Sequence, residues 1–168
     1  MRKRILGSIA IICSYAAIAW WLYIERREAD NNGRKRDKFI KYYHVFNKWV
    51  SNVNQGISNE MLLKDMGIQT VAVYGNGEVG CRFVESLKGT SIKVECIIEK
   101  RADEIPMGEN DGIKIVGTNE TSQYSQVDAI IVTPMFDYEK IENELLDKNI
   151  EPEVISIEDL LFREMNMN

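Results

Sequence analysis

The ten residues from Val71 to Gly80 (VAVYGNGEVG) constrain the fold of this chain more than any other stretch. An apolar, β-branched run leads directly into the spacing G-x-G-x-x-G, formed by Gly75, Gly77 and Gly80. This order predicts a buried strand, a tight turn and a helix. In such a turn the first glycine permits the bend, the second lets the backbone approach a pyrophosphate, and the third lets the helix pack on the strand. The sequence therefore predicts a phosphate-binding turn at a helix N-terminus, where free N–H groups face the anion.

An acidic residue follows at the place that a dinucleotide site requires. Residues 92–98 (IKVECII) alternate and then run apolar, which predicts a second parallel strand. The strand ends at Glu99, nineteen residues beyond Gly80, where the fingerprint places an acid that binds the ribose 2′-hydroxyl. An acid there favours NAD over NADP, although Lys100 and Arg101 blur the preference by charge. The alternative interpretation is a solvated acid at a strand end.

The remaining pattern after Glu99 predicts more strands and helices of the same kind. We expect a loop over 100–111, short strands over 112–116 and 152–155, a stronger strand over 128–134, and at most one helical turn within 118–126. Asp137 is expected to cap a helix, and Ser156 to begin another. Together these elements predict an α/β fold with a small doubly wound, mostly parallel sheet.

Thr133 and Pro134 join the candidate site, since the carboxyl ends of parallel strands line the ligand crevice in such sheets. The candidate cofactor-binding residues are Gly75, Asn76, Gly77, Glu78, Val79, Gly80, Glu99, Lys100, Thr133 and Pro134.

The N-terminal stretch from Ile5 to Ile24 carries no formal charge over twenty residues. A helix of that length, at about 1.5 Å per residue, matches a bilayer core of about 30 Å. Trp20, Trp21 and Tyr23 at its far end are typical of an interfacial aromatic belt. We predict a transmembrane anchor with basic flanks over residues 1–27. The alternative is a cleaved signal peptide with a small-x-small site at residues 17–19, but the apolar run continues beyond that site.

Charge is divided unevenly along the chain. Residues 1–48 hold 11 Lys and Arg against 4 Asp and Glu, whereas residues 49–168 hold 10 against 22. This split favours a basic segment at an anionic membrane surface and an acidic soluble domain, and it argues against a nucleic-acid partner. More basic residues follow the apolar stretch than precede it, so the positive-inside rule favours a cytoplasmic C-terminal domain.

We expect the chain after the anchor to form three further parts. Residues 28–37 are polar and are interpreted as a juxtamembrane linker, either solvated or resting on anionic headgroups. Residues 38–67 form a helical segment, with an aromatic-rich helix over 39–53 and a short helix over 59–66. We expect helix 39–53 to dock on the domain or on a second copy of itself. The nucleotide-binding domain then occupies residues 68–168.

Catalytic signals are missing from the sequence. No tyrosine has a lysine four positions later, so the catalytic pair of short-chain epimerases and dehydrogenases is absent. There is no P-loop lysine, G-x-S-x-G or H-E-x-x-H motif. Cys13, Cys81, Cys96 and the lone His44 lack metal-ligand spacing and are interpreted as reduced or structural side chains.

Several stretches resemble a known group of proteins: residues 42–67, 70–80, 97–100, 130–137 (IIVTPMFD) and 155–161 (ISIEDLL). The chain over about residues 40–163 resembles small bacterial Rossmann-type domains of the nucleoside-diphosphate-sugar epimerase-like group, which occur alone or fused to surface-polysaccharide enzymes. The resemblance implies a nucleotide-sugar ligand and a role near polysaccharide synthesis. The group commonly carries aspartate where this chain has Glu99. Glu78 within the turn also matches the nucleotide-binding domains of potassium-uptake regulators.

The leading hypothesis is a membrane-anchored, cytoplasmic, Rossmann-like protein that binds NAD or a nucleotide sugar. Two alternatives stay open. One is a non-catalytic interaction module with a degenerate pocket, which would position a glycosyltransferase or form a homo-oligomer through helix 39–53. The other is an NAD-binding regulatory sensor.

Overall fold

The computed structural model describes the backbone of residues 2–102 and 108–164, and side chains from Trp20 onward within those ranges. The chain divides into two compact units, Met1–His44 and Val45–Asn168. The described part of the first unit is helical and belongs to α1 (Arg2–Asn54), whose last turns belong to the second unit.

Residues 28–37, interpreted above as a linker, continue α1 without interruption, and helix 39–53 is the end of this same helix. The segment contains no proline, and acids precede bases at i,i+4 spacing in the pairs Asp30/Arg34 and Asp37/Lys41. Gly33 lowers helix stability by only about 1 kcal/mol. Polarity alone was therefore a poor indicator of a break. The expected end of the helix is confirmed at Asn54, and Gly56 follows with φ 76°.

Within the part of the chain that the structure describes, no helix has a stretch long and apolar enough to cross a bilayer. The stretch Ile5–Ile24 lies mostly before Trp20, outside the residues whose side chains are described.

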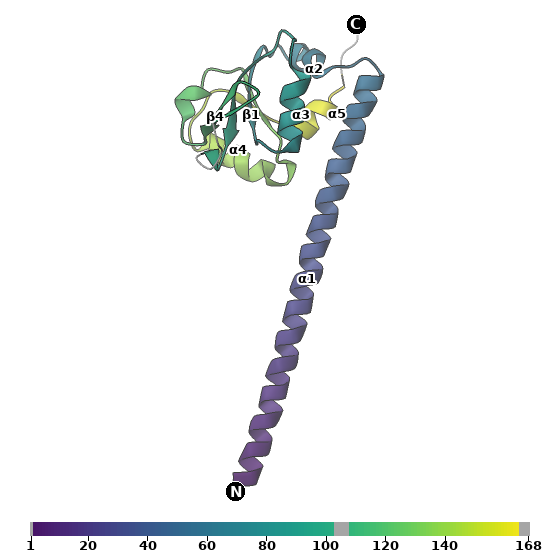
Figure 1. The fold of residues 1–168 in the computed structure, drawn as a ribbon, viewed down its shortest axis with the longest axis vertical. Coiled ribbons are helices and arrows are strands. Elements are labelled where there is room, and N and C mark those ends of the chain that lie inside the picture. The colour runs from purple at the N-terminus through teal and green to yellow at the C-terminus, as the bar shows by residue number, and fades with distance from the viewer. Residues whose placement is uncertain (1, 103–107, 165–168) are drawn as a thin grey trace. The chain divides into compact units, whose positions relative to one another are not determined.

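The second unit is built on a six-stranded sheet (Figure 1). Its strand order is β3-β4-β2-β1-β5-β6, and every neighbouring pair is parallel except β3 with β4. This confirms the predicted α/β class with a mostly parallel sheet. The strands are β1 (Thr70–Tyr74), β2 (Lys93–Glu99), β3 (Glu109–Asn110), β4 (Ile113–Gly117), β5 (Ala129–Val132) and β6 (Glu153–Ser156). The two-residue β3 lies where the sequence predicts a loop.

The central strand β1 ends level with β5 and one residue before the end of β2. Tyr74, its last residue, is in register with Ile98 of β2 and with Val132 of β5. Because the chain crosses to β2 on one side of β1 and to β5 on the other, the strand order reverses at this point. Such reversals leave a crevice at the carboxyl ends of the strands.

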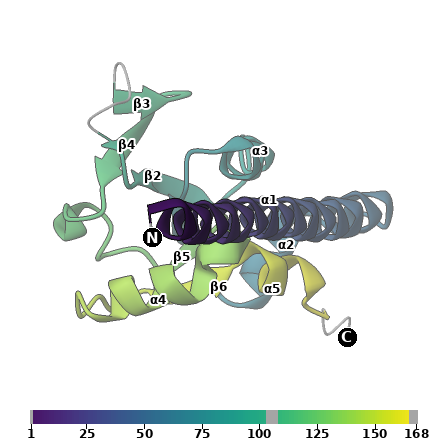
Figure 2. The ribbon, with the colours of Figure 1, turned by 90° about the horizontal axis from the view of Figure 1, so that it is seen from below.

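Helices cover both faces of the sheet (Figure 2). α4 lies on one face, and α3 and α5 lie on the other. The helices of this unit, beyond the end of α1, are α2 (Asn59–Asp65), α3 (Glu78–Ser86), α4 (Tyr138–Leu146) and α5 (Ile157–Phe162), with 3-10 turns η3 (Thr121–Gln123) and η4 (Met135–Asp137). The single turn expected within 118–126 is η3.

Two helix starts were predicted from capping residues, with different outcomes. Ser156 precedes α5, and its hydroxyl accepts a hydrogen bond from the Glu158 N–H, so this cap is confirmed. Asp137 occupies the N-cap position of α4, but its side chain makes no capping bond. The 3-10 turn η4 runs directly into α4 and supplies a preceding helical turn in place of the extended N-cap conformation that a side-chain cap requires.

The core follows from alternation along the strands. On the α4 face, alternate strand residues such as Tyr74, Ile98 and Val132 form one buried cluster with Ile141 and Leu145 of α4. Their neighbours along the strands point to the opposite face.

The last turns of α1 contribute to the core of the second unit. Val45 and Asn52 are buried, and the Trp49 ring meets the Phe83 ring edge-on at 6.2 Å. Residues from Val45 onward in α1 thus pack against the rest of the second unit.

Candidate functional site

The glycine turn connects the central strand β1 to α3, as the sequence predicts. Gly75 has φ 103°, a conformation that side chains disfavour. A Cβ atom added there would lie 2.8 Å from the Thr133 hydroxyl oxygen and 3.0 Å from the Pro134 ring. The turn is therefore pressed against the end of β5 and requires glycine at this position.

Gly80 is required for a different reason. A Cβ atom added at Gly80 would lie 2.0 Å from the Gly75 carbonyl oxygen, which belongs to the backbone and cannot turn aside. The absence of a side chain at Gly80 therefore lets α3 start directly over the turn. This is the packing role that the third glycine of the motif predicts.

Gly77 faces open space. No atom lies within 4 Å of an added Cβ, and its φ of −83° suits any residue. Gly77 is the N-cap of α3, and no side chain caps this end of the helix. The turn thus leaves room beside the α3 N-terminus, where N–H groups favour an anion.

Glu99 lies at the end of β2 and binds the glycine turn directly. Its Oε2 accepts a hydrogen bond from the Asn76 N–H at 3.0 Å, and its Oε1 accepts one from the Arg101 N–H at 3.3 Å. The side chain of Asn110 on β3 donates to Asn76 Oδ1 at 2.8 Å. The predicted acid is therefore fixed against the predicted turn, twenty-odd residues apart in sequence.

A cavity of about 260 Å³ opens at the carboxyl ends of β1, β2 and β5. The strand order reverses here, so the cavity occupies the crevice expected from the topology. Its lining comes from the strand ends, the glycine turn and α4: Tyr74, Gly75, Glu99, Lys100, Pro134, Asp137, Lys140, Ile141 and Glu144.

Charges of both signs surround this cavity. Lys100 and Lys148 each approach Glu144, with nitrogen–oxygen distances of 3.8 Å.

Burial, and then the carboxylates of Glu144 and Glu99, raise the pKa of Tyr74 to about 12. Tyr74 therefore stays a neutral hydroxyl at physiological pH. It can donate or accept a hydrogen bond but cannot serve as a base there.

The structure separates the predicted site residues into two groups. Gly75, Glu99, Lys100 and Pro134 line the cavity. The remainder do not line it and lie in the turn, in the first turn of α3 or at the end of β5: Asn76, Gly77, Glu78, Val79, Gly80 and Thr133.

Thr133 has a structural role in this arrangement. Its hydroxyl donates to the Tyr74 carbonyl at 2.9 Å, and its side chain is buried. The proton of this hydroxyl is used to join the ends of β1 and β5, so Thr133 shapes the turn.

Sequence reasoning missed the contribution of α4. Asp137, Lys140, Ile141 and Glu144 follow i, i+3, i+4, i+7 spacing, so they share one helix face. This helical spacing can be recognised in the sequence. The sequence does not show which face of the sheet α4 covers.

The cavity lining provides hydrogen-bond donors and acceptors, and the glycine turn leads from this lining at Gly75 to the anion-favouring N-terminus of α3. These groups suit a ligand with both hydroxyls and phosphates. Among residues 20–102 and 108–164, no group of three His, Cys, Asp or Glu side chains is placed to hold a metal ion.

Comparison with known proteins identifies one family. No curated protein matches the chain. The model of the N-terminal domain of C2185-like proteins matches residues 67–156. That range contains the whole sheet from β1 to β6, the glycine turn and every lining residue of the cavity. The chain belongs to the C2185-like family.

Proposed function

We propose that this protein binds NAD or a nucleotide sugar in a Rossmann-like domain, and that its N-terminal helix anchors it to the membrane. One observation carries the proposal: the Glu99 carboxylate meets the glycine turn beside a cavity at the strand-order reversal. The setting in surface-polysaccharide synthesis is supported by the resemblance described above. The anchor is supported by the uncharged stretch from Ile5 to Ile24.

Different residues would contact three parts of the ligand. Phosphates would lie at Gly77, where the α3 N-terminus is uncapped and open. A ribose would bind Glu99, whose carboxylate has further acceptor capacity beyond its two backbone hydrogen bonds. A base would enter the cavity between Lys100 and Pro134.

Ligand-induced stabilisation of the full chain in detergent tests this assignment. The panel is NAD, NADP, UDP-glucose and coenzyme A, measured by thermal shift. We expect NAD or UDP-glucose to stabilise the wild-type chain. At a hundred times the dissociation constant, the gain is about 2.7 kcal/mol.

Gly77→Val is the informative variant, because the fold has space for its side chain. It should unfold near the wild-type temperature without ligand and lose the ligand-induced shift, since the added methyl groups occupy the phosphate position. Gly33→Val is a matched control within α1, where an added Cβ also meets nothing within 4 Å. An equal ligand shift in the wild type and Gly77→Val would remove the site assignment.

The same assay separates the alternatives. If none of the four ligands shifts the unfolding temperature, an interaction module with a degenerate pocket is favoured. NADH is then added to the panel, and unequal stabilisation by NAD and NADH, without interconversion of the two in a separate absorbance assay, would favour a regulatory sensor.

A further inference from the structure

The end of α1 carries two adjoining apolar stripes, which meet where the Phe46 and Trp49 rings stack on each other. The first faces the sheet unit: Val45 and Asn52 are buried, and Trp49 contacts Phe83. The second consists of Phe39, Tyr43, Phe46, Val50 and Val53, and we call it the seam.

The spacing of the seam is that of a coiled coil. Its residues are separated by four, three, four and three positions, which places apolar side chains at alternating d and a positions of a heptad. The seam is largely exposed, with 72% of the Phe39 surface, 59% of Tyr43, 58% of Val50 and 59% of Val53 accessible. Scattered exposed apolar residues are normal, but a continuous stripe at heptad spacing is typical of a helix-pairing surface.

We propose that the seam pairs in parallel with the seam of a second copy of this chain. The proposal does not depend on nucleotide binding. Its parallel orientation rests on the proposed anchor, which would place both N-termini in the same membrane.

Charge placement is compatible with self-pairing. The positions that flank the seam, e and g of the heptad, are Ile40, Tyr42, Asn47 and Trp49, none of which is charged. Lysines 41 and 48 occupy f positions, on the side of the helix remote from the seam. Two identical helices therefore meet without the like-charge repulsion that would oppose a homodimer.

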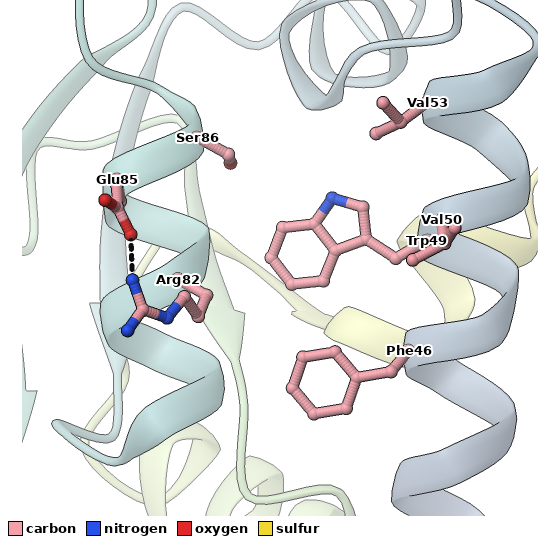
Figure 3. Close-up of a pocket in the computed structure, with 7 residues that line it drawn as sticks. All are labelled: Phe46, Trp49, Val50, Val53, Arg82, Glu85 and Ser86. Carbon is pink, nitrogen blue, oxygen red and sulfur yellow. Dashed lines mark hydrogen bonds and ion pairs between the residues drawn. The ribbon is translucent and has the colours of Figure 1, made fainter.

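A groove continues the seam toward α3 (Figure 3). It has a volume of about 370 Å³ and is lined by Phe46, Trp49, Val50 and Val53 of α1 and by Arg82, Glu85 and Ser86 of α3. Phe46 and Trp49 point from α1 toward α3, and Arg82 pairs with Glu85 on the opposite wall. Side chains of a paired helix thus have an apolar recess beside the seam.

The seam is short, but the helix that carries it is already ordered. Isolated helices of about 12–15 residues are marginal in water. Here the Asn52 side chain donates to the Leu161 carbonyl at 2.9 Å, and Trp49 packs on Phe83. Since these contacts hold the end of α1 in place, pairing does not have to order it.

Disulfide cross-linking of the full chain in detergent tests the pairing. The background carries Cys13→Ser and Cys81→Ser and retains Cys96, which is only 2% exposed. Tyr43→Cys and Val50→Cys, at a positions, should form disulfide-linked dimers under mild oxidation. The matched controls Lys41→Cys and Lys48→Cys, at f positions of α1, should not. Equal cross-linking at a and f positions, or none at the a positions, would overturn the proposal.

A second set of variants asks whether the apolar seam drives the pairing. With Tyr43→Cys as reporter, Val50→Glu should lower the cross-linked fraction at least about tenfold, the change produced by about 1.4 kcal/mol. Gln55→Glu adds the same charge at an exposed position away from the seam and should leave the fraction unchanged. An unchanged fraction in the Val50→Glu variant would exclude the seam as the interface. Because the assay contains no nucleotide and no bilayer, its failure is distinct from failure of the proposed function.

Discussion

Asp128 joins the beginnings of two neighbouring strands through a single carboxylate oxygen. Its Oδ2 accepts hydrogen bonds from the Gln69 N–H and the Thr70 N–H, both at 2.8 Å, and from the Thr70 hydroxyl at 3.0 Å. These bonds, with Gln69 the largest contribution and Thr70 next, hold the pKa of Asp128 below its ordinary value. At the opposite edge of the sheet, Glu99 at the end of β2 and Thr133 after β5 fix the glycine turn. Side chain-to-backbone bonds of this kind set the position of β1 within the sheet.

Asp128→Asn should destabilise the protein at neutral pH, by about 1 kcal/mol, because an exposed carboxylate gains little from each bond. The depressed folded-state pKa means that the charged form contributes stability above the unfolded-state pKa. That contribution is lost as pH falls through the folded-state pKa. Urea denaturation at pH 7, 5 and 3 should therefore give a difference between wild type and variant that shrinks toward pH 3. A difference that does not change with pH would contradict this role for the charge.

At the scale of elements, the end of α1 is part of the sheet unit. The buried Asn52 amide donates to the Leu161 carbonyl in the last turn of α5, where helix carbonyls have no partner within the helix. The backbone carbonyl of Asn52 also accepts a hydrogen bond from the Ile57 N–H, beyond the end of the helix. One residue thus connects α1, the following turn and α5.

Asn52→Ala should cost about 1–3 kcal/mol, because the Leu161 carbonyl would lose its partner in a buried position. Asn54→Ala is the matched control, since Asn54 is the exposed last residue of α1 and most surface changes stay within about 0.5 kcal/mol. Free energies of unfolding from urea titrations followed by circular dichroism measure both. Equal effects for the two variants would show that the hydrogen bond from the Asn52 side chain to the Leu161 carbonyl does not stabilise the packing of α1.

At the scale of the whole molecule, the chain joins a basic N-terminal part to an acidic sheet unit. The first 48 residues carry 11 basic side chains, and the rest of the chain carries 22 acidic ones. If residues 5–24 cross a bilayer, the basic residues that follow would face anionic headgroups while the acidic unit stays away from them.

Fractionation of cells that express the full chain tests the anchor. The wild-type chain should stay with membranes after alkaline carbonate extraction. Replacing Ile12 and Ala16 with arginine should release it, because each charge near the centre of a spanning helix costs about 2.5–3.5 kcal/mol on insertion scales. The Asn31→Arg variant, with its charge outside the apolar stretch, should stay with membranes after extraction as the wild-type chain does. A purified chain shortened by about its first nineteen residues would instead identify a cleaved signal peptide.

Local sequence pattern was sufficient to predict part of the fold. Apolar runs and glycine spacing placed β1, the turn and α3, because burial and backbone freedom act through neighbouring residues. The role of Gly80 could be predicted in the same way, because the atom that excludes a side chain there, the Gly75 carbonyl oxygen, belongs to the same motif. The contacts that exclude a side chain at Gly75 come instead from Thr133 and Pro134, which lie far away in the chain. Glu99 was found by its distance from Gly80, which a strand–helix–strand unit fixes.

Contacts between distant segments could not be predicted from local pattern and are known only from the folded chain. The α4 side of the cavity, the contact of Asn110 with the turn, and the structural use of Thr133 all join residues far apart in the chain. The sequence analysis interpreted residues 28–37 as a linker and missed the continuity of α1, because a polar stretch is typical both of a loop and of a solvated helix. The direction in which each stripe of α1 faces depends on the packing of Trp49 and Asn52, and helical spacing alone gives two stripes without saying which one is buried.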